Sequence, residues 1–387
     1  MTGCRSRSTT SEAATDATTG KETDAATDPA TRREAPPRRA RYRRPAGASV
    51  TAALAATAAF VALAAGPGSA APTSAGAGPF GAFLGSGALG AERTAGFSAW
   101  LGGADLRVGH TYLPGGRWSD IEGTPAVVDV WAHWRAGKAD RMLVLNVPML
   151  EGSEDGLPDD EVRSLLRRGA AGEFDAHFRR LARRLVDTGA PDTVVVLGWE
   201  MNGTTYTHRC GPDPEAWKAY WNRIVAAMRA VPGQRLRFDF APNRGRDAVP
   251  WPECYPGDAT VDVIGMDAYD QPAGMSFDQQ VAEPYGLQAQ ADFAASHGKP
   301  LSYPEWGLFR NGDNPGYMRG MLTWMTDHQP LYNTLTDYCP HGVWECSGNP
   351  RASAVYRAQI AATGGGAGTG AGPGVTPAPS PSPAAPR

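Results

Sequence analysis

The feature of this sequence that most restricts its fold is the alternation of short apolar segments with longer amphipathic ones between residues 79 and 363. The apolar segments are rich in Val, Ile, Leu and Phe, as buried β-strands are. Eight are expected to be strands: Phe80–Leu84, Leu106–Thr111, Met142–Val147, Thr193–Trp199, Leu236–Ala241, Val261–Met266, Pro300–Pro304 and Leu331–Thr336. Alternating strands and helices indicate a parallel α/β fold, and eight units in about 285 residues predict one (β/α)8 TIM barrel.

The helical segments between these strands carry their large apolar residues on one stripe. The clearest is Asp213–Val231, in which Asp213 is expected to cap the helix and Pro214 occupies its first turn. Glu173–Val186 and a segment that begins at Asn314 have the same periodicity. Residues 244–258 lack it, and we expect a long loop there.

The two ends of the chain differ in composition from this central region. Residues 1–45 contain almost no large apolar side chains and are expected to be a disordered leader. Residues 46–71, with a basic pair before them, an apolar run and then small residues, are typical of a signal peptide hydrophobic region and cleavage site. Residues 364–387 are rich in Gly, Pro and Ser and resemble a disordered linker. We therefore expect secretion, with an uncleaved N-terminal anchor at the cell surface as the alternative.

Charge and motif content restrict the class of partner. Residues 1–45 carry a net charge of +4 and the whole chain −3, so the remainder carries −7. A mildly acidic domain argues against nucleic acid or an anionic membrane as a partner and suits a neutral substrate. The sequence has no glycine-rich phosphate loop or dinucleotide fingerprint. We expect a monomer that needs neither a metal nor a cofactor.

Four of the five cysteines lie in the predicted barrel. An even number suits disulfides in an oxidising compartment, and the spacing matches no usual zinc site. Four cysteines allow three pairings. We favour Cys210 with Cys254 and Cys339 with Cys346, because each pair would link loops at one end of the barrel.

Carboxylates and amides follow several of the predicted strands. The fourth strand, in VVVLGWEMNG, ends at Glu200 and Asn202, and the seventh, in LSYPEWG, ends at Glu305. In a (β/α)8 barrel the carboxyl ends of the strands form the active-site face, and strands on opposite sides point toward each other across it. Two facing carboxylates are what glycosidic bond cleavage requires, one as acid and the other as nucleophile or base.

The motifs that carry a family resemblance are WEMNG (199–203), FAPN (240–243), YPGD with VDVIGMDAY (255–269) and KPLSYPEWG (299–307). In order and spacing they resemble glycoside hydrolase family 26, the β-mannanase-like family whose catalytic glutamates follow barrel strands four and seven. The resemblance implies that Glu200 is the acid/base and Glu305 the nucleophile of a retaining enzyme. It also implies that Tyr269 hydrogen-bonds the nucleophile and that His110 and Asn243 line the sugar site.

The remaining candidate substrate-binding residues follow from side-chain chemistry. Trp199 and Trp306 offer flat apolar faces for pyranose rings, and Asn202 and Asn243 offer hydrogen bonds to hydroxyls. Trp199 stands where the best-known family members have a histidine, so a stacking surface replaces a polar contact. Asp267 is expected to brace loops without a catalytic role.

The sequence therefore predicts a secreted retaining glycoside hydrolase acting on a β-linked polysaccharide or oligosaccharide, with endo-β-1,4-mannanase activity favoured. The same mechanism on β-1,3/1,4-glucan or β-1,3-xylan is an alternative. A glycan-binding barrel without catalytic activity is another, and the presence of both glutamates argues against it.

Overall fold

The computed structural model describes residues 77–364. The predicted leader and signal peptide, and the predicted tail apart from Gly364, lie outside these residues. Within the described part of the chain no helix is long and apolar enough to cross a membrane.

The strands form one parallel sheet whose members match the predicted segments closely. They are β1 (Phe80–Phe83), β2 (Val108–Tyr112), β3 (Met142–Val147), β4 (Val194–Leu197), β5 (Arg237–Phe240), β6 (Val263–Ile264), β7 (Ala268–Tyr269), β8 (Ser302–Gly307) and β9 (Tyr332–Thr336). Their order in the sheet is β6-β5-β4-β3-β2-β1-β9-β8-β7, and every pairing is parallel.

The short strands β6 and β7 are two parts of one barrel strand. β6 pairs with β5 and β7 pairs with β8, and only three residues separate them. Bridges from Ile264 to Leu301 and from Asp267 to Asn243 continue the pairing on both sides. The amide of Met266 also donates to the carbonyl of Ser302 at 3.2 Å. The sheet therefore closes, which gives the predicted eight-stranded TIM barrel with its sixth strand interrupted.

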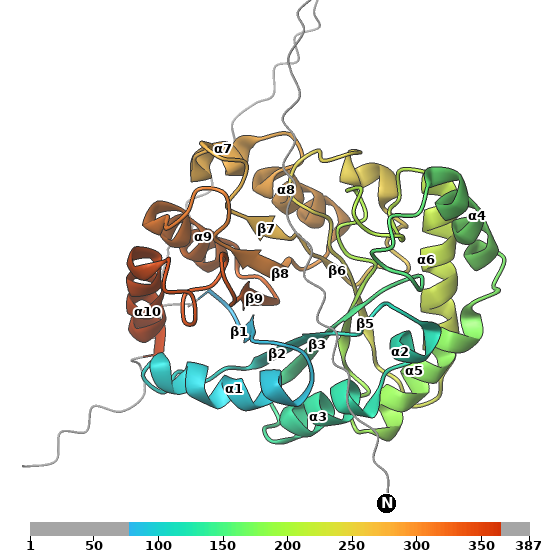
Figure 1. The fold of residues 1–387 in the computed structure, drawn as a ribbon, viewed down its shortest axis with the longest axis horizontal. Coiled ribbons are helices and arrows are strands. Elements are labelled where there is room, and N and C mark those ends of the chain that lie inside the picture. Colours follow the sequence, from blue (N-terminus) through green and yellow to red (C-terminus); the bar gives the residue numbers. More distant parts are fainter. Residues whose placement is uncertain (1–76, 365–387) are drawn as a thin grey trace, which may run out of the picture. The chain divides into compact units, whose positions relative to one another are not determined.

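Helices surround the barrel strands, as Figure 1 shows. They are α1 (Gly87–Trp100), α2 (Trp118–Ile121), α3 (Pro125–Ala136), α4 (Asp159–Ala170), α5 (Asp175–Asp187), α6 (Pro214–Arg229), α7 (Phe277–Ala282), α8 (Leu287–His297), α9 (Pro315–His328) and α10 (Pro350–Gly364). The Asp213 side chain accepts a backbone hydrogen bond at the start of α6, as predicted, and the Asn314 side chain does the same at the start of α9. Residues 244–258 form the expected loop, with one 3₁₀ turn at Trp251–Cys254.

The interior of the barrel contains both apolar and polar side chains. Val108, Val144, Val194, Val196 and Trp199 belong to one buried apolar cluster on β2 to β4 and just after β4. Polar side chains also face the interior. The Asp239 carboxylate of β5 accepts hydrogen bonds from Ser302 of β8 and Tyr332 of β9 across the barrel, at 2.5 and 2.6 Å. Because buried polar groups need partners, such side chains are paired with one another across the barrel.

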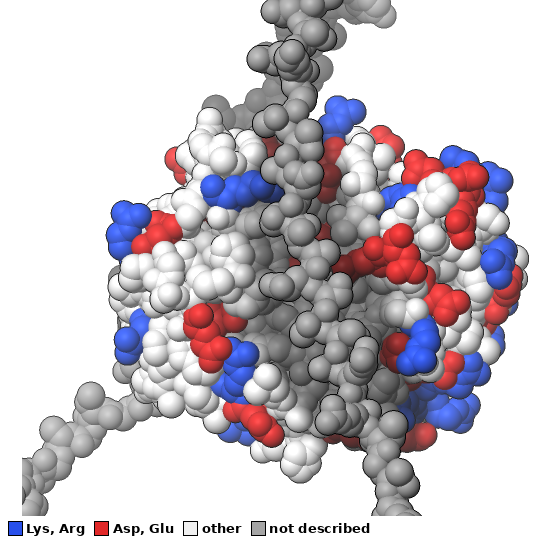
Figure 2. Space-filling view, viewed as in Figure 1, with Lys and Arg blue, Asp and Glu red and all other residues white. Residues whose placement is uncertain are grey.

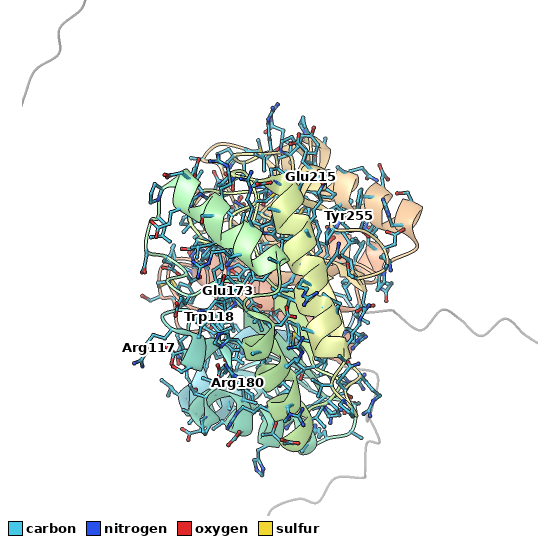
Figure 3. The ribbon with its side chains drawn as sticks, turned by 90° about the vertical axis from the view of Figure 1, so that its right-hand side faces the viewer. Arg117, Trp118, Glu173, Arg180, Glu215 and Tyr255 are labelled. Atoms are coloured by element: carbon cyan, nitrogen blue, oxygen red, sulfur yellow. A yellow bond between two sulfur atoms is a disulfide. The ribbon has the colours of Figure 1, made fainter. Side chains whose placement is uncertain are left out.

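The helix α2 is fastened to the outer layer by its tryptophan. The Trp118 ring stacks on His177 and Phe174, with ring centroids 4.3 and 4.8 Å apart. Arg180 and His177 both contact the Glu122 carboxylate just after α2. Figure 3 labels Trp118 and Arg180 on this side of the molecule. The contacts hold the connection after β2 against α5, and so fix one wall beside the barrel end.

Both predicted disulfides are present. Cys210 pairs with Cys254, 44 residues apart, and Cys339 pairs with Cys346, seven residues apart. The first joins the connection after β4 to the connection after β5, and the second closes a loop after β9. Both therefore constrain loops that follow strands, which is the end of the barrel where the candidate site lies.

We predict unequal stabilisation by the two disulfides, because a cross-link that closes a longer loop removes more entropy from the unfolded chain. Replacing Cys210 and Cys254 by serine should lower the free energy of unfolding by about 4 kcal/mol, and replacing Cys339 and Cys346 by about 2 kcal/mol. Urea unfolding of the two double variants and the parent measures both losses. Equal losses would contradict the loop-length argument.

Candidate active site

Glu305 points into the barrel because β8 contains a bulge. Tyr303 pairs with Asn333 and Trp306 pairs with Leu335, so three steps along β8 oppose two along β9. Side chains alternate along a regular strand, and Ser302 faces inward, where it bonds to Asp239. Without the extra residue Glu305 would face the helices. The bulge reverses the alternation and turns the carboxylate inward.

The Glu305 carboxylate is held by neutral donors. The Tyr269 hydroxyl donates to Oε2 at 2.7 Å, and the Asn146 amide donates to Oε1 at 3.2 Å. The Tyr112 hydroxyl is a third hydrogen-bond partner. Burial raises the pKa of Glu305, and these three hydrogen bonds oppose that rise. Donors stabilise the ionised form of a carboxyl group, so the arrangement favours Glu305 as a carboxylate.

Glu200 has a different environment. Its backbone lies in the left-handed region at φ 50°, which is uncommon for a residue with a side chain and is found at functional sites. No described residue donates a hydrogen bond to its carboxyl group. Burial, then the charges of Glu305 and Asp247, raise the pKa of Glu200 to about 8.

The two glutamates therefore divide the acid and base roles by their surroundings. Glu305 has three donors that stabilise its charge, whereas Glu200 has none and is repelled by that charge. When two nearby carboxyl groups interact in this way, one keeps its proton while the other ionises. At neutral pH the pair is suited to a protonated Glu200 facing an ionised Glu305.

Two further carboxyl groups lie in the barrel interior. Asp267, in the interruption of the sixth strand, is fully buried. Burial, together with the charges of Glu305 and Glu200, raises its pKa well above the ordinary value. Burial also raises the pKa of Asp239 to about 6. The role expected for Asp267 was loop bracing; the structure places it near Glu305 and Glu200, where a protonated Asp267 adds no further negative charge.

His110 lies behind the candidate nucleophile. Its side chain is fully buried, and its Nε2 and Nδ1 atoms lie 2.9 Å from Asn146 Oδ1 and 3.0 Å from Thr334 Oγ1. Burial lowers the pKa of His110 to about 4, so the ring is neutral at neutral pH. The contact with sugar that the family resemblance implies stays a prediction, and the contacts seen here are with protein groups.

The two predicted asparagines occupy one turn. The Asn202 amide donates to the carbonyl of Asn243, and its Oδ1 accepts from the Asn243 amide N–H, both at 2.9 Å. Asn202 is fully buried, so its side chain joins the ends of β4 and β5. The Asn243 side chain is partly exposed and donates to Asp247 at 2.9 Å. Its Oδ1 is buried and has no hydrogen-bond partner among the described residues, so the contact of Asn243 with sugar stays a prediction.

The two predicted stacking tryptophans are almost fully buried. Trp306 has no exposed surface, and its ring lies 6.1 Å from Tyr356 of α10, on the helical side of β8. The bulge that turns Glu305 inward turns Trp306 outward, so the expected sugar-facing surface is absent at this position. Trp199 is 5% exposed and makes edge contacts with Tyr112 and Tyr206, which leaves little of its ring for a sugar.

Three side chains that were not expected in the site, Asn146, Tyr112 and Tyr338, lie around the two glutamates, together with Tyr206, a flat face that the sequence had offered for a sugar ring. Asn146 and Tyr112 bond Glu305, and burial, together with the charges of both glutamates, raises the pKa of Tyr206 and Tyr338. Tyr338 is 49% exposed and is thus a better stacking surface than either tryptophan. The sequence signal for Asn146 was a lone amide inside the apolar strand MLVLNV.

The surroundings of the site are acidic. Asp247 raises the pKa of Glu200 and Glu154 raises that of Tyr206, whereas no lysine or arginine contributes to the pKa of either glutamate. Figure 2 shows acidic side chains reaching close to the middle of the face that Figure 1 views. Among the described residues no group of three or more His, Cys, Asp or Glu side chains could hold a metal ion.

Comparison with known families supports the class that this geometry defines. Residues 182–302 match the model of glycosyl hydrolase family 26, a segment that includes Glu200 and ends three residues before Glu305. The resemblance expected from the sequence motifs is confirmed over this segment. No curated protein sequence matches the chain.

Solved structures with the same architecture include several mannanases. An endo-β-1,4-mannanase of Cellulomonas fimi is 18% identical over 73% of this chain and 70% of that one, with a TM-score of 0.56. A Bacillus subtilis mannanase is 17% identical over 73% and 85%, with a TM-score of 0.54. A family 26 β-mannanase of Bacteroides ovatus is 17% identical over 75% and 88%, with a TM-score of 0.53. These likenesses show the TIM-barrel fold, and together with the family match they support a glycoside hydrolase.

We predict that Tyr269→Phe moves the acidic limb of the pH–activity profile upward. The variant loses one donor to the ionised Glu305, so the pKa of Glu305 rises by about one unit. Activity requires ionised Glu305, and it should therefore be lost at a higher pH than in the parent as the pH falls. The dependence of kcat/KM on pH measures the shift, and an unmoved acidic limb would show that Tyr269 does not act on Glu305.

Proposed function

We propose that the protein is a retaining glycoside hydrolase that cleaves β-linked polysaccharide, with endo-β-1,4-mannanase activity as the favoured specificity. The observation that carries the proposal is the unequal environment of the two glutamates, of which only Glu305 receives donors. The family 26 match over residues 182–302 supports the class, a glycoside hydrolase.

In the first step of this mechanism, protonated Glu200 gives its proton to the glycosidic oxygen. The Glu305 carboxylate attacks the anomeric carbon, the bond to the leaving oxygen breaks, and a glycosyl ester forms on Glu305. Glu200 is then ionised and Glu305 is neutral. The pair carries one negative charge before and after the step, so the buried site never has to hold two.

In the second step, ionised Glu200 takes a proton from water. The water oxygen attacks the anomeric carbon and displaces the Glu305 carboxylate, so the configuration at that carbon is retained over the two steps. The donors from Tyr269, Asn146 and Tyr112 stabilise the charge that returns to Glu305 as it leaves.

The acidic surroundings support an uncharged polymer as the substrate. A uronate or a sulfated sugar would bring a further negative charge to a site whose neighbours are carboxylates. Mannan is favoured because the structural neighbours include enzymes described as endo-β-1,4-mannanases. Mixed-linkage β-glucan and β-1,3-xylan are uncharged too and are the alternatives.

We also propose that the protein works outside the cell, as its N-terminal sequence indicates. The pairs Cys210–Cys254 and Cys339–Cys346 support this, because disulfides persist in oxidising compartments.

We expect different losses when the two glutamates are replaced. Glu305→Gln removes the nucleophile and should lower kcat on every substrate by at least about a thousandfold. Glu200→Gln removes the acid and should lower kcat by about 10²–10⁴-fold on a polysaccharide, but much less on an aryl glycoside whose phenolate leaves without a proton. Steady-state kinetics of both variants on both substrates measures the difference.

Hydrolysis of mannan, β-glucan and β-1,3-xylan by the parent, followed by NMR of the first-formed anomer, tests the proposal as a whole. If a β-linked substrate first yields the β-anomer, the result supports retention. If it first yields the α-anomer, the result shows inversion. A parent protein that binds these polymers and cleaves none of them would be a binding barrel.

The alkaline limb of the pH profile is expected near pH 8. Glu200 must be protonated to act as an acid, and its pKa is raised to about 8, so activity should fall as the pH rises through that value. The phenolate of an aryl glycoside leaves without a proton, so the first step on this substrate does not need protonated Glu200. The loss of activity above pH 8 should therefore be much smaller on the aryl glycoside. Equal alkaline limbs on both substrates would contradict the assignment of the limb to Glu200.

A further inference from the structure

A chain of buried hydrogen-bonding groups leads from β9 through β2 and β3 to Glu305. Thr334 Oγ1 lies 3.0 Å from His110 Nδ1, His110 Nε2 lies 2.9 Å from Asn146 Oδ1, and Asn146 Nδ2 lies 3.2 Å from Glu305 Oε1. None of the first three side chains has exposed surface. The chain reaches the carboxylate on the oxygen that Tyr269 does not bond.

The direction of these hydrogen bonds follows from the charge at one end. An ionised Glu305 only accepts, so Asn146 must present its amide N–H to it. The Asn146 Oδ1 atom then faces His110, and the atom opposite, Nε2, must carry a proton. His110 is neutral, since burial lowers its pKa to about 4, so its Nδ1 is bare. The Thr334 oxygen lies 3.0 Å from that nitrogen, while the Thr334 hydroxyl proton goes to the carbonyl of Pro304.

The opposite direction is incompatible with an ionised Glu305. Because the Thr334 hydroxyl donates to the carbonyl of Pro304, the Thr334 oxygen could accept a hydrogen bond from neutral His110 only if the ring proton stood on Nδ1. His110 Nε2 is then an acceptor that requires the Asn146 amide N–H. The Asn146 Oδ1 atom would turn toward Glu305, where two acceptors repel unless Glu305 is protonated.

We propose that His110 and Asn146 are positioning residues for the nucleophile, with neutral His110 in its Nε2–H form orienting the Asn146 amide so that its donor faces Glu305. This inference rests on the proposed function, in which Glu305 is the nucleophile. His110 makes no hydrogen bond to Glu305 and acts on it through Asn146.

Other groups also act on Glu305, and the test has to keep them constant. The titratable side chains that face it are Tyr112, Glu200, Tyr206, Asp267, Tyr269 and Tyr338. None is changed in the variants chosen below. A shift of the Glu305 titration is therefore assigned to the Asn146 donor.

The direct test is the tautomer of His110 in the parent protein. Nitrogen NMR of ¹⁵N-histidine-labelled protein distinguishes a neutral ring protonated at Nε2 from one protonated at Nδ1, and the His110→Gln variant assigns the signal among the seven histidines. We expect the Nε2–H form between pH 6 and 8, a range chosen above the pKa of His110. A neutral ring protonated at Nδ1 in that range overturns the proposal.

Variants test whether the orientation matters for Glu305. His110→Leu and Asn146→Ala should lower kcat about tenfold or more with little change in KM, and should move the acidic limb upward by about one pH unit. His110→Gln can still offer an amide N–H to Asn146 and should recover most of the loss. Thr193→Val is the matched control, since it also removes a buried hydrogen bond, 2.8 Å to the Ala190 carbonyl at the other end of β4.

The outcomes separate this inference from the proposed function. Carbon NMR of ¹³C-glutamate-labelled protein follows the Glu305 titration without any substrate, and Asn146→Ala should raise it. If the parent hydrolyses no glycan, the proposed function fails while the tautomer and the titration still decide the positioning role. The Thr193→Val control should leave the titration of Glu305 as in the parent. If Glu305 also titrates as in the parent in folded His110→Leu and Asn146→Ala proteins, the positioning role is wrong.

Discussion

The structure depends on one constraint, which is that a buried carboxylate must stay ionised at the end of the barrel without a cation beside it. Burial raises the pKa of Glu305, and no lysine or arginine lowers it. Neutral donors from three strands do so instead: Tyr112 on β2, Asn146 on β3 and Tyr269 on β7. The curvature of the sheet matters because β7 lies beside β8, whereas β2 and β3 reach the same carboxyl group from across the barrel interior.

Much of the barrel could be predicted from the sequence, because the alternation of strands and helices is a local signal. β3 was predicted at both of its ends, and the caps Asp213 and Asn314 follow from side chains that favour helix starts. The interruption between β6 and β7 could not be predicted. It depends on how VIGMDAY bonds to two neighbouring strands at once, and those contacts are not local.

The candidate site was predictable where a polar residue ends an apolar strand, as Glu200 and Glu305 do. It was not predictable where the side-chain direction depends on pairing. Simple alternation from Ser302 would have Trp306 facing inward, and only the register of β8 against β9 reveals the reverse. Asn146 was not predicted for a related reason. The role of one amide in a buried strand cannot be inferred until the side chains that face it in the barrel are known.

The left-handed backbone at Glu200 has a consequence for how such barrels change over evolutionary time. In that conformation glycine costs least and asparagine is tolerated, whereas most other residues are strained. Selection for catalysis must therefore keep a glutamate where the main chain prefers something smaller. Once that selection is relaxed, a descendant should drift to glycine or asparagine at this position and gain conformational stability. Such a substitution in a homologue would mark a barrel that has given up cleavage while keeping its fold.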